Sequence, residues 1–244
     1  RYPGARCDIP SLEYSYQFDD ELQQEWNWTE KYSAQPEILD YINHVADRIE
    51  LRDGIQFEEE VTKAIFDEKK ATWSIKTTKN EYESRFVIFA TGCLSVPNKP
   101  DFEGLEKFEG QFLQTSTWPQ EEQNFSGKKV AIIGTGSSAI QSIPLIAEQA
   151  DQLYVFQRTP NYSIPSNNGP MDKEKEREVK SRYSDFRKEN WQNGFGIAAL
   201  SDESLISETE LEVVHNQLEE NWNSAGLGFF GGYADIPIDA KSNE

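Results

Sequence analysis

The sequence has few cysteines, few histidines and fewer basic than acidic residues. Each of these shortages argues against a class of protein. Two cysteines cannot form a disulfide framework, so a reducing, cytoplasmic setting is expected. Two histidines leave little material for a zinc site, and no metal is expected. Lysine and arginine number 24 against 43 aspartates and glutamates, a net charge of −19. This disfavours nucleic acid as a partner, because binding phosphates requires concentrated positive charge.

Long apolar runs are also missing. No apolar stretch approaches the ~20 residues that cross a bilayer, so no membrane span is expected. Aromatic residues, in contrast, are plentiful. With 6 Trp, 10 Tyr and 14 Phe, the chain is predicted to fold despite its acidic composition. Its 244 residues allow one or two domains.

Local periodicity predicts a helix followed by an antiparallel meander. Between residues 33 and 51 apolar side chains recur at helical spacing, Ser33 can cap the start, and Pro36 lies in the first turn. Strand-like runs follow at 61–66, 72–77 and 83–90, with turn-forming residues between them. Residues 86–89 (FVIF) are continuously apolar and are predicted to form a strand buried on both faces.

Further along the chain, composition indicates a boundary and then more helices. Residues 93–127 are interrupted by prolines and glycines, as is typical of a connection between domains. Residues 172–193 and 202–223 are charged and helix-prone, with a glycine-rich break at 194–196. The glycine-rich stretch 225–233 is expected to form a loop.

The strongest chemical motif spans residues 130–139 (VAIIGTGSSA). It combines an apolar strand, the pattern G-x-G-x-x-A and a helix predicted to reach Gln149, with a second strand at 153–156. Gly134 permits a tight turn, Gly136 lets a pyrophosphate approach the backbone, and Ala139 lets helix and strand pack closely. The helix N-terminus offers N–H groups to phosphates. The motif therefore predicts a dinucleotide site.

The end of the second strand indicates which dinucleotide binds. NAD-binding units place a carboxylate there for the ribose hydroxyls, whereas residues 157–159 are Gln, Arg and Thr. Arg158 suits a 2′-phosphate, which favours NADP; a surface arginine at a strand end is the alternative. A weaker signal is Ala90-Thr91-Gly92, a strand end typical of the passage from the flavin to the nicotinamide domain in two-dinucleotide flavoproteins.

Three motifs together resemble class B flavoprotein monooxygenases, and within that class the Baeyer–Villiger monooxygenases. Residues 1–8 (RYPGARCD) resemble the end of the flavin-proximal motif. Residues 108–119 (FEGQFLQTSTWP) resemble the signature F-x-G-x-x-x-H-x-x-x-W-P. Residues 134–141 (GTGSSAIQ) with 156–160 (FQRTP) resemble the NADP site. The resemblance runs along essentially the whole chain.

The resemblance implies an α/β fold of the two-dinucleotide-binding-domain flavoprotein type, Rossmann-like and three-layered, with an antiparallel β meander and a helical insertion. It implies a remnant of an FAD-binding domain over residues 1–98, the first part of an NADP-binding domain over 99–168, and a helical insertion with a glycine-rich loop over 169–244. The implied cofactors are FAD and NADPH.

The implied activity is oxygenation of a small-molecule ketone to an ester or lactone with NADPH and O₂. Oxygenation at nitrogen or sulfur is the alternative within the class. A catalytically inactive nucleotide-binding fragment and a regulatory protein that kept only the nucleotide fold are alternatives from other classes, because a fold alone does not determine function.

The resemblance also implies site residues. Asp8 matches the family's active-site acid, although its sequence context alone is that of an ordinary turn residue. Cys7 and Cys93 are predicted to be buried rather than nucleophilic. Val61 matches a position whose backbone meets the FAD adenine. The implied cofactor-binding residues are Arg6, Cys7, Asp8, Tyr14, Val61, Ala90, Thr91, Gly92, Gly134, Thr135, Gly136, Ser137, Ser138, Ala139, Ile140, Gln141, Arg158 and Thr159.

The chain departs from the family pattern in two ways. Gln114 occupies the position of the signature histidine, and a glutamine can hydrogen-bond but cannot titrate near neutrality. The G-x-G-x-x-G that holds the FAD pyrophosphate is expected before Arg1, and the active-site arginine after Glu244. The chain is therefore expected to be an internal fragment of a longer enzyme.

On this expectation, residues 1–244 expressed alone purify without yellow colour and consume no NADPH with any ketone. The reason is the missing flavin anchor and the missing neighbours of apolar strands. An absorption spectrum and an NADPH-consumption assay measure both outcomes. Bound FAD together with a sharp thermal melt would contradict the expectation.

Overall fold

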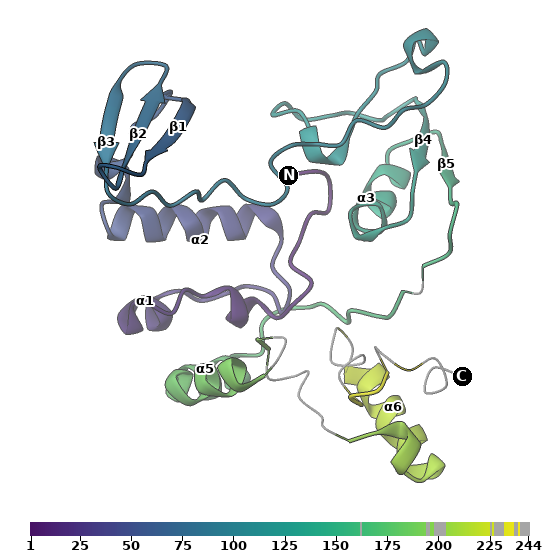
Figure 1. The fold of residues 1–244 in the computed structure, drawn as a ribbon. Coiled ribbons are helices and arrows are strands. Elements are labelled where there is room, and N and C mark those ends of the chain that lie inside the picture. Colours follow the sequence, from purple (N-terminus) through teal and green to yellow (C-terminus); the bar gives the residue numbers. More distant parts are fainter. Residues whose placement is uncertain are drawn as a thin grey trace. The chain divides into compact units, whose positions relative to one another are not determined.

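The computed structural model describes residues 1–161, 163–193, 196–197, 204–224, 226, 232–236 and 239. Two compact units make up the chain: the first contains Arg1–Asn43 and Gln120–Glu244, and the second contains His44–Pro119. Each unit has its own sheet, a parallel pair in the first and an antiparallel meander in the second (Figure 1).

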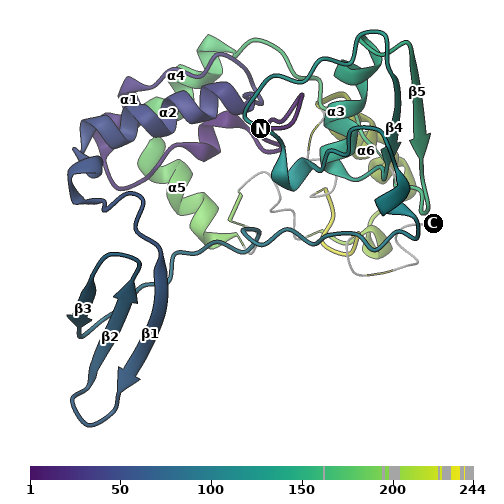
Figure 2. The same cartoon turned by 90° about the horizontal axis from the view of Figure 1, so that it is seen from above.

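A strand–helix–strand motif forms the parallel pair of the first unit. Strand β4 (Lys129–Ile133) leads through the glycine turn into α3 (Ser137–Ala147) and then β5 (Gln152–Phe156). The two strands are parallel neighbours, and α3 lies beside them in both ribbon views (Figures 1 and 2). The prediction of this motif is confirmed. The helix ends at Ala147 rather than Gln149. The N–H of Gln149 donates to the carbonyl of Ile146, three residues earlier, so the α-helical pattern of bonds four residues apart has stopped there.

Short helices and aromatic rings build the rest of the first unit. The 3₁₀ helix η1 (Ser11–Tyr14) and helix α1 (Asp20–Glu25) precede α2 (Gln35–Arg48), which continues into the second unit. The core includes Leu22, Trp28 and Tyr41, and the rings of Trp28 and Tyr41 have centroids 5.0 Å apart. The helix predicted between residues 33 and 51 is thus confirmed as α2.

The charged segment after residue 170 is helical, as predicted. It forms α4 (Lys173–Ser181) and α5 (Tyr183–Gln192), separated at Arg182, and later the 3₁₀ helix η6 (Ile206–Glu208) and α6 (Leu211–Ser224). Asp172 caps α4 by accepting hydrogen bonds from the N–H groups of Glu174 (2.8 Å) and Lys175 (3.2 Å). Most of the glycine-rich break at 194–196 and of the loop predicted over 225–233 lies outside the described residues.

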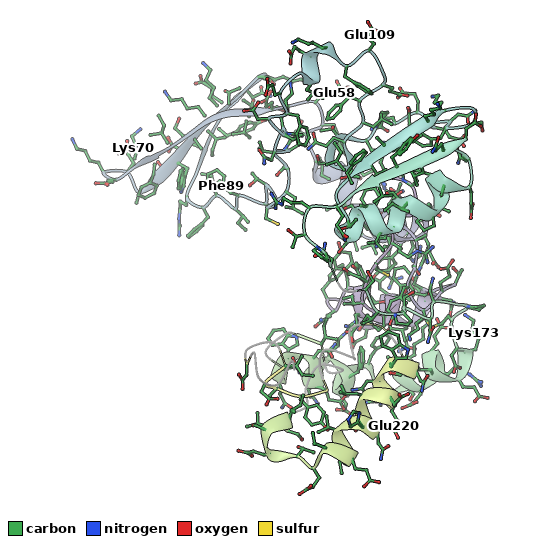
Figure 3. All side chains as sticks on the ribbon, turned by 90° about the vertical axis from the view of Figure 1, so that its right-hand side faces the viewer. Glu58, Lys70, Phe89, Glu109, Lys173 and Glu220 are labelled. Carbon is green, nitrogen blue, oxygen red and sulfur yellow. The ribbon has the colours of Figure 1, made fainter. Side chains whose placement is uncertain are left out.

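The second unit contains the predicted antiparallel meander. Strands β1 (Val61–Asp67), β2 (Thr72–Thr77) and β3 (Glu81–Ser84) are joined in sequence order. Figure 3 shows Lys70 at the tip of the β1–β2 hairpin, where Asp67 accepts the N–H groups of Lys69 and Lys70. The 3₁₀ helices η2 (Leu51–Gly54), η3 (Leu105–Lys107) and η4 (Thr115–Thr117) complete the unit.

The strand predicted at 86–89 is wrong. The third strand ends at Ser84, and Phe86, Ile88 and Phe89 are 76%, 91% and 58% exposed. A strand buried on both faces needs hydrogen-bonded neighbours and covering layers, and no strand among the described residues pairs with 86–89. The stretch instead runs beside the meander (Figure 3), where the ring of Phe89 meets that of Trp73 edge-on at 5.7 Å.

Among the described residues, no helix is both long and apolar enough to cross a membrane.

The burial pattern predicts which leucines stabilise the first unit. Leu22→Ala should lower the free energy of unfolding by about 2–5 kcal/mol, because Leu22 is 0% exposed and its removal leaves a cavity. The matched control is Leu39→Ala, at a position 44% exposed, which should change the free energy by no more than about 0.5 kcal/mol. Urea unfolding followed by circular dichroism measures both. Equal losses for the two variants would contradict the described core.

Candidate dinucleotide site

The glycine turn between β4 and α3 presents backbone N–H groups at a helix start. Gly134 has φ +105°, a conformation that other residues rarely adopt, and its N–H donates to the carbonyl of Phe156 at 2.9 Å. Gly136 is the N-cap residue and makes no side-chain cap bond. The N–H of Ala139 donates to the Gly136 carbonyl at 2.9 Å, whereas the N–H groups of Ser137 and Ser138 have no carbonyl ahead of them in the helix and form an anion-binding position.

The end of β5 is tied to the same turn. The amide of Gln157 donates to Thr135 Oγ1 at 2.9 Å, and that of Asn161 donates to the Thr135 carbonyl at 3.1 Å. Arg158 and Thr159 lie between these two contacts and are exposed. The structure therefore places the positively charged Arg158 in the segment that borders the glycine turn. Gln157 and Asn161 were not singled out from the sequence, although their place just after the second strand was a usable signal.

Arg6 is held by a polar cluster at the start of the first unit. Its Nη1 donates to Glu30 Oε2 at 2.9 Å and to the carbonyl of Tyr32 at 3.2 Å. The amide of Asn168 donates to the same Glu30 oxygen at 2.6 Å. Part of the Arg6 charge is therefore already neutralised within the protein, and contact with a cofactor depends on the other N–H groups of its guanidinium.

Cys7 and Asp8 are neighbours with opposite surroundings. Cys7 is buried, its N–H donates to the carbonyl of Ser33 at 3.0 Å, and its sulfur lies 3.8 Å from Ser11 Oγ. Cys7 is therefore buried as predicted, and this burial raises the pKa of its thiol. Asp8 is exposed next to it. Cys93 is also exposed, and the prediction that it is buried is wrong because its proline-rich segment packs under no described layer.

The remaining predicted residues are divided between the units. Tyr14 ends η1 in the first unit, and burial raises its pKa. Val61 begins β1 in the second unit, where residues 90–92 are also exposed and Gly92 has φ +74°. Gln114, in place of the signature histidine, donates to the carbonyl of Asn98 at 2.7 Å. A common flavin contact for Val61, residues 90–92 and the first-unit residues stays a prediction.

A buried charge network that no sequence motif indicates lies next to Tyr14. Arg187 of α5 donates from Nη2 to the carbonyls of Leu12 (3.0 Å) and Ser15 (2.9 Å), and from Nη1 to Glu13 Oε2 (3.2 Å). Burial raises the pKa of Glu13 and lowers that of Arg187, while their mutual attraction opposes both shifts. Residues 13 and 187 are 174 positions apart, so no local pattern indicates the pair.

The described part of the chain contains no group of three or more His, Cys, Asp or Glu side chains arranged to hold a metal ion.

The glycine turn, the helix start and the neighbouring cation define a dinucleotide-binding α/β unit. The family model described as pyridine nucleotide-disulphide oxidoreductase matches residues 13–221. The chain therefore belongs to the pyridine nucleotide-disulphide oxidoreductase family.

Curated relatives are similar along the whole chain. The 2-oxo-Delta(3)-4,5,5-trimethylcyclopentenylacetyl-CoA monooxygenase of Pseudomonas putida is 35% identical over 255 residues, which is 100% of this chain and 46% of that protein. A Baeyer-Villiger monooxygenase of Pseudooceanicola batsensis is 37% identical, over 100% of this chain and 45% of that protein. Phenazine N-monooxygenase PhzNO1 of Lysobacter antibioticus is 34% identical, over 100% and 46%. The chain spans less than half the length of these relatives.

Solved structures agree. An oxidized steroid monooxygenase bound to NADP superposes with a TM-score of 0.92 at 46% identity, covering 100% of this chain and 47% of that one. The OTEMO complex with FAD and NADP gives a TM-score of 0.90 at 34% identity, covering 100% and 47%. The predicted α/β flavoprotein fold and the resemblance to Baeyer–Villiger monooxygenases are confirmed.

The Glu13–Arg187 pair generates a test by double-mutant cycle. Arg187→Met should lower the free energy of unfolding by about 3–5 kcal/mol, because it leaves Glu13 buried without its counter-charge. Glu13→Gln together with Arg187→Met should restore part of that loss, because it removes the unpaired buried charge while the carbonyls of Leu12 and Ser15 still lack their donor. Urea unfolding of the four proteins gives the coupling energy. Additive losses would show that the pair does not interact.

Proposed function

We propose that this chain supplies the NADPH site and part of the FAD site of a flavin-dependent monooxygenase. The whole enzyme oxygenates a ketone to an ester or lactone, using NADPH and O₂. The observation that carries this proposal is the glycine turn at the start of α3 with a cation on the adjoining strand end. The similarity of the whole chain to a Baeyer-Villiger monooxygenase supports the reaction class.

The glycine turn fits a pyrophosphate. A Cβ atom added at Gly134 or Gly136 would meet no described atom within 4 Å, so the space that a side chain would fill is open beside the backbone. The backbone N–H groups of residues 135–138 and the hydroxyls of Ser137 and Ser138 would hold the phosphates, because the N–H groups of Gly134, Ala139 and Ile140 donate to carbonyls of the protein. Arg158 would bind the 2′-phosphate, with Thr159 beside it. NADPH supplies a hydride to the flavin when both are bound.

The residues proposed to contact the flavin are Arg6, Cys7, Asp8 and Tyr14 in the first unit and, in the second unit, Val61 and residues 90–92. Asp8 is the proposed catalytic acid, an exposed carboxylate next to a buried cysteine. The segment that carries Asp8 is held by hydrogen bonds from Cys7 and Ser11 to Ser33, and further along the chain by the bond from Arg187 to the Leu12 carbonyl. Such support fixes where a carboxylate sits, which an active site requires.

The proposed domain assignment follows the same division of roles. Residues 1–98 belong to the FAD-binding domain, 99–168 to the NADP-binding domain and 169–244 to a helical insertion. We also propose a cytoplasmic location and a small apolar substrate, with no nucleic-acid partner. The exposed free thiol of Cys93 and the net charge of −19 support these assignments.

A second candidate function is oxygenation at nitrogen. It is favoured by the similarity of the whole chain to phenazine N-monooxygenase PhzNO1, which matches the Baeyer-Villiger relative closely in identity and coverage. The two reactions share the cofactors, so the flavin-loaded protein must be assayed with a ketone and with an aromatic amine or N-heterocycle. Oxygenation only at nitrogen would replace the first proposal, and a whole enzyme that never binds flavin would overturn both.

Cofactor preference tests the assignment of Arg158. Arg158→Ala should weaken NADPH binding by about 10- to 150-fold and change NADH binding little, because only NADPH carries the 2′-phosphate that a charged hydrogen bond would hold. Arg177→Ala, another exposed arginine, is the control and should affect neither. Equal weakening of both cofactors by Arg158→Ala would contradict the assignment. Binding to the flavin-loaded protein is measured by calorimetry with the oxidised cofactors.

A further inference from the structure

Three residues of the N-terminal segment meet one residue of α3. The Tyr2 hydroxyl donates to Gln141 Oε1 at 2.8 Å, and Gln141 Nε2 donates to the carbonyl of Arg6 at 3.2 Å. Between them, Gly4 lies against the main chain of Gln141 itself. The ribbon views agree, since the N-terminus lies close to α3 in both (Figures 1 and 2). Residues 2, 4 and 6 therefore form one face of the N-terminal segment, and this face docks on the helix.

The approach at Gly4 is so close that only glycine fits. A Cβ atom there would lie 2.1 Å from the Gln141 carbonyl oxygen, and Gly4 has φ +75°. Both facts exclude a side chain, because backbone atoms of a helix cannot yield as a flexible side chain can. This docking face is thus complementary to the helix in shape as well as in hydrogen bonding.

The position of Gln141 separates it from the phosphate-binding turn. It lies four residues after Ser137, or roughly 6 Å along the helix axis, so its own N–H belongs to the helical ladder. Its side-chain amide is engaged at both ends, the oxygen by Tyr2 and the nitrogen by Arg6. Gln141 is among the residues that the sequence predicts to bind the cofactor, and these contacts favour a role inside the protein instead.

We propose that Gln141 is a positioning residue that fastens the segment carrying Arg6, Cys7 and Asp8 to the dinucleotide-binding helix. The consequence for the site, which rests on the proposed function, is that one side chain sets the place of the flavin-side segment relative to the nicotinamide-side helix. The carbonyl of Arg6 is two residues from Asp8, so loss of this bond removes one of the contacts that hold the backbone carrying the proposed acid.

Hydrogen exchange of the protein without NADP⁺ tests the docking itself. Gln141→Met keeps the length of the side chain and removes both hydrogen bonds. Exchange in residues 2–8, where Ala5 and Cys7 donate to Tyr2 and Ser33, should become about tenfold faster, while residues 129–156 keep their rates. Gln149→Met is the control, because Gln149 bonds the N–H of Phe125 instead and should leave residues 2–8 unchanged. Unchanged exchange in Gln141→Met would overturn the proposal.

Two further variants guard against a trivial loss of folding. Gly4→Ala blocks the docking by steric overlap and leaves Gln141 intact, so it should reproduce the faster exchange in residues 2–8. Gln141→Glu keeps the acceptor for Tyr2 and loses the donor to Arg6, so its effect should be smaller than that of Gln141→Met. Identical exchange in wild type and Gly4→Ala would overturn the proposal even if Gln141→Met proved unstable.

A split between binding and reduction distinguishes positioning from ligand contact. In the flavin-loaded protein, Gln141→Met should keep the Kd for NADP⁺ within about threefold, while the rate of flavin reduction by saturating NADPH falls about tenfold. A tenfold weaker Kd with an unchanged rate would make Gln141 a ligand and overturn the proposal. Failure of wild type to bind NADP⁺ would defeat the proposed function, and the exchange data would still decide the docking.

Discussion

The first unit depends on the strip of backbone at residues 5–7, which is bonded on two sides. On one side the Ala5 carbonyl accepts from Gln35 at 2.8 Å, and the Cys7 N–H donates to Ser33 at 3.0 Å. On the other side the Arg6 carbonyl accepts from Gln141 of α3. An extended strip can bond to both sides in this way because successive backbone groups point in opposite directions. The strip therefore joins the start of α2 to the dinucleotide motif.

Hydrogen bonds of buried and partly buried polar side chains attach the later helices to the N-terminal segment. Asn168 and Arg6 share the carboxylate of Glu30, and Arg187 reaches Glu13 and the carbonyls that end η1. A partly or fully buried charge is costly unless it is paired and hydrogen-bonded. These pairs consequently specify where α5 and the segment before α4 lie.

This arrangement supports the proposal that one chain contributes to the binding of two nucleotides. The parallel pair β4–β5 brings the glycine turn and Arg158 to one edge, which is the chemistry of a phosphorylated dinucleotide. The strip with Cys7 and Asp8 is attached to the same helix that starts at that edge.

The sequence by itself determined the local elements. The strand–glycine turn–helix–strand motif, the helix α2 and the meander β1–β3 were predicted because each rests on short-range periodicity, caps and turn residues. Only the tertiary structure shows that residues 86–89 form no strand. Their apolar run would need partner strands, and local periodicity cannot tell whether such partners are present. Tertiary structure alone revealed the Glu13–Arg187 pair and the engagement of Gln141 by Tyr2 and Arg6. Such contacts join residues more than a hundred positions apart, and their partners are set by packing rather than by local sequence.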